Sequence, residues 1–283
     1  MDKFVLRLDN AKKAIDEADF VLIGAGAGLS TAAGIDYTGE RFEKYFKDFI
    51  EEYNFTDMYS SGFYPFESLE EKWAYWARHV FANRYDVGKT EVYQKLLKLV
   101  ENKDYFVITT NVEHQFWING FEDDRIFATQ GDYGLFQCSE PCHEKLYSNR
   151  DFVFKAVGNI NDCRIPSDLI PKCPVCGKEM ALNIRIDNTF VEDEKWMEMY
   201  NNYSRYLEHA DEEKNIVFLE LGVGFNTPSI IRYPFEQMTY GKPNTTLIRL
   251  NRSSSQAIPD NKDKTICFDE KISEIFTYWL SRI

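Results

Sequence analysis

The sequence predicts an α/β fold in which helices cover both faces of a parallel sheet. Short apolar runs of strand length alternate with longer amphipathic patterns through most of the chain. The first apolar run, at residues 20–23, breaks into a glycine turn and then into small residues that suit the start of a helix. A chain of 283 residues can bury a full core, which favours one sheet domain with a smaller insert.

The expected elements follow one another in a regular order. A helix is expected over residues 2–18, because its apolar residues recur at helical spacing and share one face. These residues are Phe4, Val5, Leu8, Ala11, Ile15 and Ala18. Strands are expected at residues 20–23, 105–109, 216–221 and 246–250. Helices are expected over residues 91–100 and 270–283, which fits parallel strands joined by helical crossovers.

Two segments depart from this alternation. Residues 37–85 are aromatic, charged and helical in pattern, and residues 137–180 carry most of the cysteines. Four cysteines form two close pairs, Cys138 with Cys142 and Cys173 with Cys176. Two such pairs supply the four thiolates of a tetrahedral structural zinc site. Because 30 residues separate the pairs, reduced thiols without metal are the alternative. His143 is a substitute ligand, and Cys163 and Cys267 are expected to lie outside the site.

The composition narrows the classes of partner. The net charge is −13 and the isoelectric point is near 4.9, which argues against nonspecific nucleic-acid binding because phosphate backbones need Lys and Arg surfaces. No stretch approaches the roughly 18 apolar residues of a membrane span, and the N-terminus lacks the apolar core of a signal peptide. We therefore expect a cytoplasmic protein whose six cysteines are reduced.

The glycine turn is the strongest sign of a ligand. The run FVLIGAGAGLSTAAGID at residues 20–36 places Gly24, Gly26 and Gly28 between a strand and a helix start. Glycine admits positive φ and a close backbone approach that a Cβ would block, and the N-terminus of a helix favours an anion such as pyrophosphate. The alternative is a tight turn that binds nothing, because the third glycine of the usual G-x-G-x-x-G pattern is absent.

Several stretches together carry a resemblance to a known family. The first is residues 26–36, and the second is Thr109-Thr110-Asn111-Val112-Glu113. Thr129-Gln130-Gly131 follows, and then residues 222–224 and 250–251. In this order they resemble the motifs of the sirtuins, which are NAD-consuming protein deacylases and ADP-ribosyltransferases. The resemblance spans almost the whole chain, which a chance match to one motif would not do.

The resemblance implies a division into two domains. A Rossmann-like NAD-binding domain would comprise residues 1–36, 87–136 and 205–283. A smaller, discontinuous domain of helices with bound zinc would comprise residues 37–86 and 137–204. In sirtuins the cofactor lies in the cleft between two such domains. NAD and zinc are therefore the expected cofactors.

The resemblance also implies the residues of the site. Asp36, Asn111 and Gln130 are the expected catalytic residues. The expected NAD contacts are Gly26, Ala27, Gly28, Ser30, Asp36, Tyr37, Arg41, Thr110, Asn111, Glu113, Gln130, Gly222, Val223, Gly224, Asn226, Asn251 and Cys267. Without a ligand, Asn111 and Glu113 would cap the turn after their strand, and Asp36 and Asn226 would be turn residues. Cys267 would then be buried as a small apolar residue.

Two departures from the family pattern bear on the reaction. Residues 34–38 lack the usual proline, and Thr38 replaces an arginine whose charge Arg41 could supply. Deacylating sirtuins use a histidine at the position of Gln130 as a general base, and an amide does not take up that proton near neutral pH. Glycosidic cleavage of NAD does not need this base, so transfer of ADP-ribose to a better nucleophile stays open.

A narrower resemblance points to one branch of the family. Gln130, the glycine-rich turn, and LGVGFNTP at residues 221–228 resemble the macrodomain-linked sirtuins of microbial pathogens. This resemblance implies a protein mono-ADP-ribosyltransferase that modifies a lipoylated carrier protein related to the glycine-cleavage H protein. A partner macrodomain would remove the modification. Two alternatives stay open: an NAD-dependent deacylase that recruits another histidine in the cleft, and a sensor that binds NAD or ADP-ribose without turnover.

Overall fold

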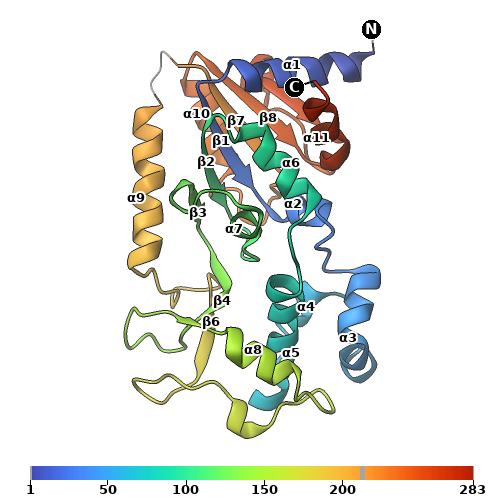
Figure 1. Ribbon diagram of the computed structural model, residues 1–283, viewed down its shortest axis with the longest axis vertical. Helices are drawn as coiled ribbons and strands as arrows, with labels where there is room; N and C mark the ends of the chain where they lie inside the picture. The colour runs from blue at the N-terminus through green and yellow to red at the C-terminus, as the bar shows by residue number, and fades with distance from the viewer. Residues whose placement is uncertain (1, 211–213, 283) are drawn as a thin grey trace.

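A parallel sheet forms the centre of the larger lobe. The computed structural model describes residues 2–210 and 214–282. Within these residues the sheet comprises β1 (Phe20–Ala25), β2 (Asp104–Thr109), β3 (Ile126–Ala128), β7 (Ile216–Leu221), β8 (Thr245–Leu250) and β9 (Thr265–Phe268). The strands pair in parallel in the order β3-β2-β1-β7-β8-β9 (Figure 1). The predicted α/β class is therefore confirmed.

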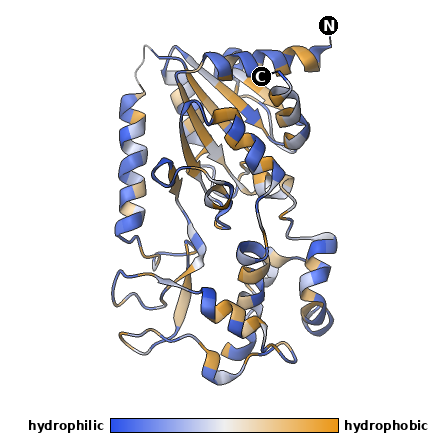
Figure 2. Cartoon of the chain, viewed as in Figure 1, coloured by the Kyte–Doolittle hydropathy of each residue, from blue (hydrophilic) through white to orange (hydrophobic). Residues whose placement is uncertain are grey.

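Helices cover both faces of this sheet. One face packs against α1 (Lys3–Glu17), α2 (Ala27–Ala32), α6 (Glu91–Val100), α7 (Gln115–Asn119) and α11 (Ile272–Leu280), and the other packs against α9 (Glu194–His209) and α10 (Arg232–Gly241). Successive strand residues alternate between the two cores, with Val21 in the first and Leu22 in the second. Because both of their faces are buried, the strands are hydrophobic along their length. In contrast, α9 is largely hydrophilic (Figure 2). No helix among the described residues combines the length and apolarity needed to cross a membrane.

The smaller lobe combines helices with an antiparallel sheet. Its helices are α3 (Gly39–Tyr53), α4 (Met58–Ser61), α5 (Leu69–Val80) and α8 (Arg150–Val157). Its strands are β4 (Gly131–Cys138), β5 (Tyr147–Ser148) and β6 (Met180–Ile184), in the order β5-β4-β6. Short helical turns are η1 (Phe81–Tyr85), η2 (Asp123–Arg125), η3 (Ser167–Leu169) and η4 (Pro259–Lys264). An aromatic core that includes Phe46, Trp73 and Phe136 joins these helices to the sheet.

The expected strands and helices of the larger lobe are confirmed to within three residues at each described end. The expected last helix extends to residue 283, which lies outside the described residues. The sequence pattern does not predict β3 and β9, which are the two edge strands. β3 has only three residues, and three of the four residues of β9 are half-buried, so neither shows the continuous apolar run of a central parallel strand.

Two elements lie across the expected domain boundaries. β4 begins at Gly131 and pairs with β5 and β6 in the smaller lobe, although the expected boundary follows residue 136. The expected boundary after residue 204 falls inside α9, and this helix packs on β3 through Trp196 and Phe127, whose ring centroids are 5.1 Å apart. We propose that the second segment of the smaller domain begins with β4 and ends before α9.

Candidate active site

The carboxyl ends of β1 and β7 mark the centre of the cleft. From β1 the chain continues to β2 on one side, and from β7 it continues to β8 on the other, so the strand order reverses between β1 and β7. Ligands of open α/β sheets bind in the crevice that such a reversal opens. The turn after β1 and the turn after β7, at residues 222–224, meet at this crevice.

Glycines let these two turns pack closely. The Gly28 N–H donates to the Gly222 carbonyl at 3.0 Å, and the Gly26 N–H donates to the Leu221 carbonyl at 3.0 Å. A Cβ on Gly28 would lie 2.7 Å from Gly222 Cα, and Gly222 itself has a φ of 62°. The glycines therefore allow a close approach between two turns of the protein, and Gly222 is the one of these three with a positive φ.

The cleft contains two adjoining cavities, which share part of their lining. The first, here called the glycine cavity, has a volume of about 750 Å³ and lies over the turns after β1, β7 and β8. The second, here called the aromatic cavity, has a volume of about 640 Å³ and extends between the lobes toward α4, α5 and β6. Both are lined by Ala27, Thr31, Tyr59, Thr110, Asn111, Gln130 and Asn226. A single elongated ligand can therefore occupy both cavities.

The structure brings most of the expected site residues to these cavities. The glycine cavity is lined by Gly26, Ala27, Gly28, Asp36, Thr110, Asn111, Gln130, Gly222, Val223, Gly224, Asn226 and Asn251. The aromatic cavity adds Ser30, Tyr37 and Glu113. Arg41 and Cys267 line neither cavity.

Hydrogen bonds hold Arg41 outside the cavities, and Cys267 lies in an edge strand. Arg41 donates hydrogen bonds to the Asp36 carbonyl at 2.9 Å, to Asn83 Oδ1 at 2.8 Å and to the Ala82 carbonyl at 2.6 Å. Its guanidinium therefore braces the loop after α2 against η1 instead of supplying a cation to the cleft. Cys267 lies in β9, the strand at the edge of the sheet, and it does not line either cavity.

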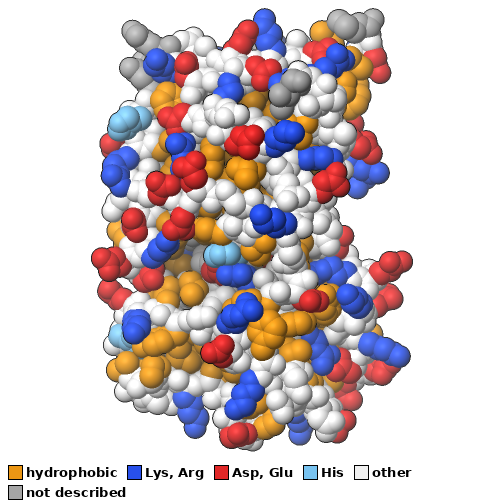
Figure 3. All heavy atoms as spheres, viewed as in Figure 1, with side chains coloured by type: hydrophobic (Ala, Val, Ile, Leu, Met, Phe, Trp, Pro, Cys, Tyr) orange, Lys and Arg blue, Asp and Glu red, His pale blue; other side chains and the backbone are white. Residues whose placement is uncertain are grey.

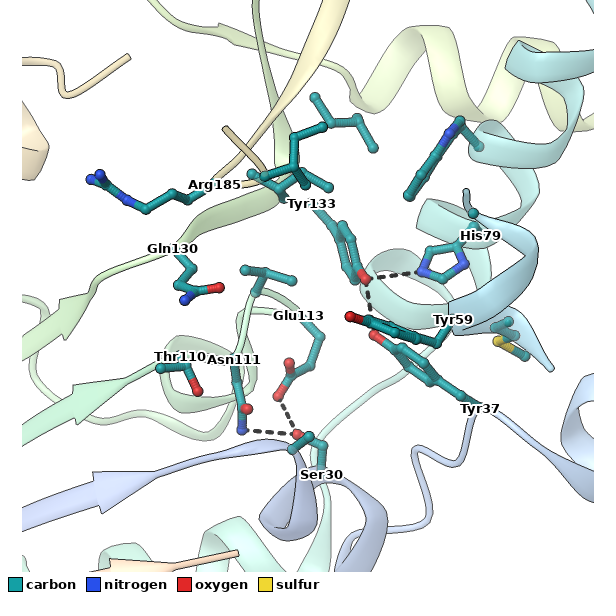
Figure 4. A pocket seen from close by; sticks show the side chains of 18 of the residues that line it. Ser30, Tyr37, Tyr59, His79, Thr110, Asn111, Glu113, Gln130, Tyr133 and Arg185 are labelled. Atoms are coloured by element: carbon teal, nitrogen blue, oxygen red, sulfur yellow. Dashed lines mark hydrogen bonds between the residues drawn. The ribbon is translucent and has the colours of Figure 1, made fainter. Parts of the chain in front are cut away.

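A hydrogen-bonded group of four buried residues forms the polar centre of the cleft. Asn111 Nδ2 donates to the Gly26 carbonyl at 3.1 Å and to Ser30 Oγ at 3.0 Å. Ser30 Oγ donates to Glu113 Oε1 at 2.7 Å, and Tyr93 Oη donates to the same oxygen at 3.1 Å. Figure 4 shows Asn111, Glu113 and Ser30 meeting at the base of the cavity. The side-chain hydrogen bonds of Asn111 to described residues all use Nδ2, and Asn111 lines both cavities, so its Oδ1 is free to accept from a ligand.

Glu113 carries a perturbed carboxyl group. Burial raises the pKa of Glu113 above its ordinary value, and hydrogen bonds from Ser30 and Tyr93 oppose that rise. Glu113 is 5% exposed. In the unfolded chain the carboxyl loses its proton at the ordinary glutamate pKa, whereas in the folded protein it keeps the proton to higher pH. Folding therefore becomes less favourable as the pH rises between these two pKa values.

Replacing Glu113 by Gln is expected to stabilise the protein at pH 8 relative to the wild type. The amide oxygen can still accept from Ser30 and Tyr93, and it carries no charge to desolvate. The gain is expected to vanish below the ordinary glutamate pKa of about 4.3, where both forms are neutral. Thermal midpoints measured from pH 4 to pH 8 test this, with the exposed Glu101→Gln as a control. A difference that does not change with pH would contradict it.

A buried histidine lies in the aromatic cavity, and no sequence pattern indicates it. His79 of α5 is 2% exposed, and its Nε2 lies 3.0 Å from Tyr133 Oη. Tyr133 Oη lies in turn 3.0 Å from Tyr37 Oη (Figure 4). Burial, with a smaller contribution from Arg41, lowers the pKa of His79 to about 3. The ring is therefore neutral near pH 7 and a weak base, which disfavours it as the histidine that a deacylase would recruit.

Gln130 lies at the junction of the two lobes, between β3 and β4. Its carbonyl accepts a hydrogen bond from the Arg185 N–H at 3.0 Å, and its side chain lines both cavities. Arg185 follows β6 and also lines the aromatic cavity, but its guanidinium pairs with Glu192 at 2.5 Å and stands 4.2 Å from the centre of the Phe190 ring. No sequence motif indicates Arg185, because its place beside Gln130 depends on how β6 pairs with β4.

His114 follows the second sequence motif but lies outside the cleft. Its Nδ1 bonds to the Asp132 carboxylate, and its ring stacks on Trp117 with centroids 4.4 Å apart. It lines neither cavity. The histidine nearest in sequence to Asn111 therefore has a structural environment, as expected for a lone histidine at a strand end.

Four cysteine sulfurs come together where β4 ends and β6 begins. They belong to Cys138, Cys142, Cys173 and Cys176, and all lie within 4.8 Å of one another. Cys138 Sγ lies 3.6 Å from Cys176 Sγ, and Cys142 Sγ lies 3.7 Å from Cys173 Sγ. Zinc with thiolates at about 2.3 Å in tetrahedral geometry needs sulfur–sulfur separations of roughly 3.8 Å, so these residues fit that metal. His143 is outside the cluster, and its Nδ1 lies 3.0 Å from Cys142 Sγ.

Comparisons with known proteins agree with this geometry. No family model matches the chain. A protein ADP-ribosyltransferase of Staphylococcus aureus (strain Mu50) is 36% identical over 278 residues, which cover 98% of this chain and 88% of that protein. A probable bifunctional ADP-ribose hydrolase/ADP-ribosyltransferase of Fusarium oxysporum f. sp. cubense is 31% identical over 269 residues, which cover 89% of this chain and 43% of that protein.

Solved structures with a similar fold are Sir2 enzymes. A Sir2 complex with a p53 peptide and NAD⁺ superposes with a TM-score of 0.62 at 15% identity, covering 97% of this chain and 98% of that chain. A second structure, from work on sirtuin substrate affinity, superposes with a TM-score of 0.60 at 16% identity and covers 100% of this chain and 99% of that chain. At these identities the likeness concerns the fold alone.

Proposed function

Because the chain belongs to the family of protein ADP-ribosyltransferases and has the sirtuin fold, we propose that it transfers one ADP-ribose from NAD to a lipoylated carrier protein and releases nicotinamide. NAD supplies the transferred group: the bond between ribose C1′ and the nicotinamide nitrogen breaks, and its electron pair leaves with nicotinamide. The acceptor's nucleophile then bonds to C1′. The chain's own residues bind the ends of NAD, orient the ribose and exclude water.

Asn111 and Asp36 are the residues that we assign to the ribose. Asn111 is held by its Nδ2 bonds to Gly26 and Ser30, and its open Oδ1 can accept from a ribose hydroxyl without changing charge. Asp36 lines the glycine cavity and is half-buried. Glu113, at the base of the aromatic cavity, is assigned to the carboxamide of nicotinamide. The backbone N–H groups of the two glycine turns are assigned to the pyrophosphate.

The position of Gln130 in the cleft is the observation that favours ADP-ribosyl transfer over deacylation. Gln130 lines both cavities, at the place where a deacylase needs a general base, and its amide does not titrate near neutral pH. His79 is a weak base and His114 lies outside the cleft. Transfer to an acceptor that is already a good nucleophile does not need such a base. The cleft therefore supports ADP-ribosyl transfer better than deacylation.

The aromatic cavity supports an acceptor that carries a long apolar arm. Its wall away from Asn111 includes Met58, Trp73, Trp76 and Leu182. Phe63 and Ile186 also line it, and they are 64% and 70% exposed. Large apolar side chains at that exposure gain by contact with an apolar ligand. A lipoyl arm on a carrier protein has this chemistry.

We further propose that a macrodomain hydrolase acts on the same modified carrier. The relative from Fusarium oxysporum carries both names, ADP-ribose hydrolase and ADP-ribosyltransferase, in a single protein. We also propose that zinc is held by the four clustered cysteines as a structural metal that fixes β4 against β6. No role in the reaction is assigned to it, because the cluster lines neither cavity of the cleft.

The proposed function is tested by nicotinamide release measured with three acceptors. Incubation with NAD and a lipoylated carrier is expected to release nicotinamide, whereas an unlipoylated carrier or no acceptor is expected to release far less. Recovery of intact NAD in every case would mean that the protein is a sensor. Formation of O-acyl-ADP-ribose from an acyl-lysine peptide would mean that it is a deacylase.

A further inference from the structure

Four charged side chains lie buried behind the glycine cavity, and the proposed reaction does not use them. They are Glu220 of β7, Arg249 of β8, and Arg232 and Glu236 of α10, here called the buried charge cluster. Arg249 donates to both carboxylate oxygens of Glu220, at 2.7 and 2.9 Å, and to Glu236 at 2.8 Å. Arg232 lies 3.7 Å from the carboxylates of both Glu220 and Glu236. The cluster is electrically balanced, with two positive and two negative groups.

The cluster reaches the two loops that line the glycine cavity at the ends of β7 and β8. Arg249 Nη1 donates to the Gln256 carbonyl at 2.9 Å, and Arg232 Nη1 donates to the Ser254 carbonyl at 3.0 Å. The guanidinium of Arg232 also stands 4.4 Å from the centre of the Phe225 ring. Phe225 lies between Gly224 and Asn226, which both line the glycine cavity. One cluster therefore holds the loop after β7 (residues 222–227) and the loop after β8 (residues 251–256).

The same two loops are tied together again on the cavity side. Asn251 Nδ2 donates to the Val223 carbonyl at 2.7 Å, and Asn251 Oδ1 accepts from the N–H groups of Ser253 and Ser254 at 3.1 Å each. Asn251 thus links the two loops on the side that lines the glycine cavity, and the buried charge cluster contacts them from the protein interior. The separation of the loops is set by both attachments.

A gain in stability does not by itself explain why these four charged side chains are buried. Removing charges from water is costly, and well-packed apolar side chains often stabilise a core as well as a buried ion pair does. Arginine forks, however, can bind backbone carbonyls at a fixed distance and direction, which apolar side chains do not do. Each of these arginines donates one hydrogen bond to a carbonyl of the loop after β8, which lines the glycine cavity through residues 251–253.

We propose that the buried charge cluster positions the two loops for the adenosine half of NAD and thereby sets the affinity of the protein for ADP-ribose. The inference rests on the proposed use of NAD. Arg232 and Arg249 are positioning residues, because they touch the loops and not the cavity. Disturbing them is expected to weaken binding of the adenosine half and to leave the chemistry near Asn111 largely unchanged.

The test is direct binding of ADP-ribose, measured by calorimetry on the whole protein. Arg232→Met removes the donor to Ser254 and the charge over Phe225, and it is expected to raise the Kd for ADP-ribose about tenfold. In turnover assays the KM for NAD is expected to rise similarly, with kcat within about twofold. Phe225→Ala removes the ring that Arg232 faces; because this ring is 59% exposed, the variant is expected to fold normally and to raise the Kd about threefold.

The matched control is Glu71→Gln in the smaller lobe. Glu71 is also buried and paired with an arginine, Arg164, at 2.6 Å, but it lies outside both cavities. This variant is expected to lower the thermal midpoint and to leave the Kd for ADP-ribose unchanged. Unchanged Kd values in folded Arg232→Met, or in Phe225→Ala where the first variant does not fold, would overturn the inference. Failure of the wild type to bind ADP-ribose would instead overturn the proposed function.

Discussion

Asn111→Ala is expected to lower NAD turnover by about 10²–10³-fold while the protein still folds. Asn111 is 8% exposed, bonds the glycine turn through the Gly26 carbonyl and lines both cavities. Loss of the amide removes the group assigned to the ribose, and it also removes the donor to Ser30 Oγ. Turnover is measured as nicotinamide released in the presence of the carrier.

Asn119→Ala is the matched control for this variant. Asn119 is also buried, at 3% exposed, and its Nδ2 donates to the Gln115 carbonyl at 2.8 Å. It lines neither cavity. Its loss is expected to cost about 1–3 kcal/mol of stability without a comparable loss of turnover. Normal turnover by Asn111→Ala with an unchanged melting curve would contradict the role assigned to Asn111.

Loss of zinc is expected to have the largest effect on stability. Structural zinc contributes about 10–16 kcal/mol of apparent binding free energy in small zinc-finger peptides at neutral pH. The clustered sulfurs belong to segments that also build the core of the smaller lobe, since Cys138 and Cys173 are both in that core. Cys173→Ser is therefore expected to lower the thermal midpoint by at least roughly 10 °C and to release the metal.

Cys163→Ser separates loss of metal from loss of a buried sulfur. Cys163 lies in the same core and is 4% exposed, but it is outside the four-cysteine cluster. This control is expected to keep its zinc, measured as metal content per chain, and to shift the midpoint by only a few degrees. A zinc-free wild-type protein with an unchanged midpoint would remove the structural role of the metal.

The parts of the fold that follow from local pattern could be predicted from the sequence. Residues 20–25 are apolar on both faces of the sheet and run directly into a glycine turn, so both the strand and the cleft at its end are expected from a single stretch. The cysteine pairs are likewise recognisable because each is a local pattern. Three of the four residues of β9 are half-buried, so this strand lacks such a signal.

The parts of the site that depend on distant contacts could not be predicted. His79, Tyr133 and Tyr37 come from α5, β4 and the loop after α2, and their hydrogen bonds exist only because these three segments come together at the aromatic cavity. Arg41 has the charge expected of an anion ligand, but η1 offers it two acceptors, at Ala82 and Asn83, and these hold it away from the cavities. The charge of Arg41 and its place in the sequence do not reveal that protein acceptors compete with a ligand for its guanidinium.

The contacts of the charged residues in the central strands could not be predicted from the sequence either. Glu220 and Arg249 are neighbours in the register of β7 and β8, yet each stands alone in an otherwise apolar run. Their pairing and their contacts with α10 follow from the order of the strands and from the helix that covers that face. A sequence pattern that identifies the strands therefore does not show what their charged residues do.

The most direct test of the central claim is the intact mass of a lipoylated carrier protein after incubation with this protein and NAD. An increase by one ADP-ribose on the lipoylated carrier alone, reversed by a macrodomain hydrolase, is the predicted result. The unlipoylated carrier and an acetyl-lysine peptide are the controls, and both are expected to keep their mass. An unchanged carrier together with a deacetylated peptide would contradict the account and would mean that the cleft catalyses deacylation despite Gln130.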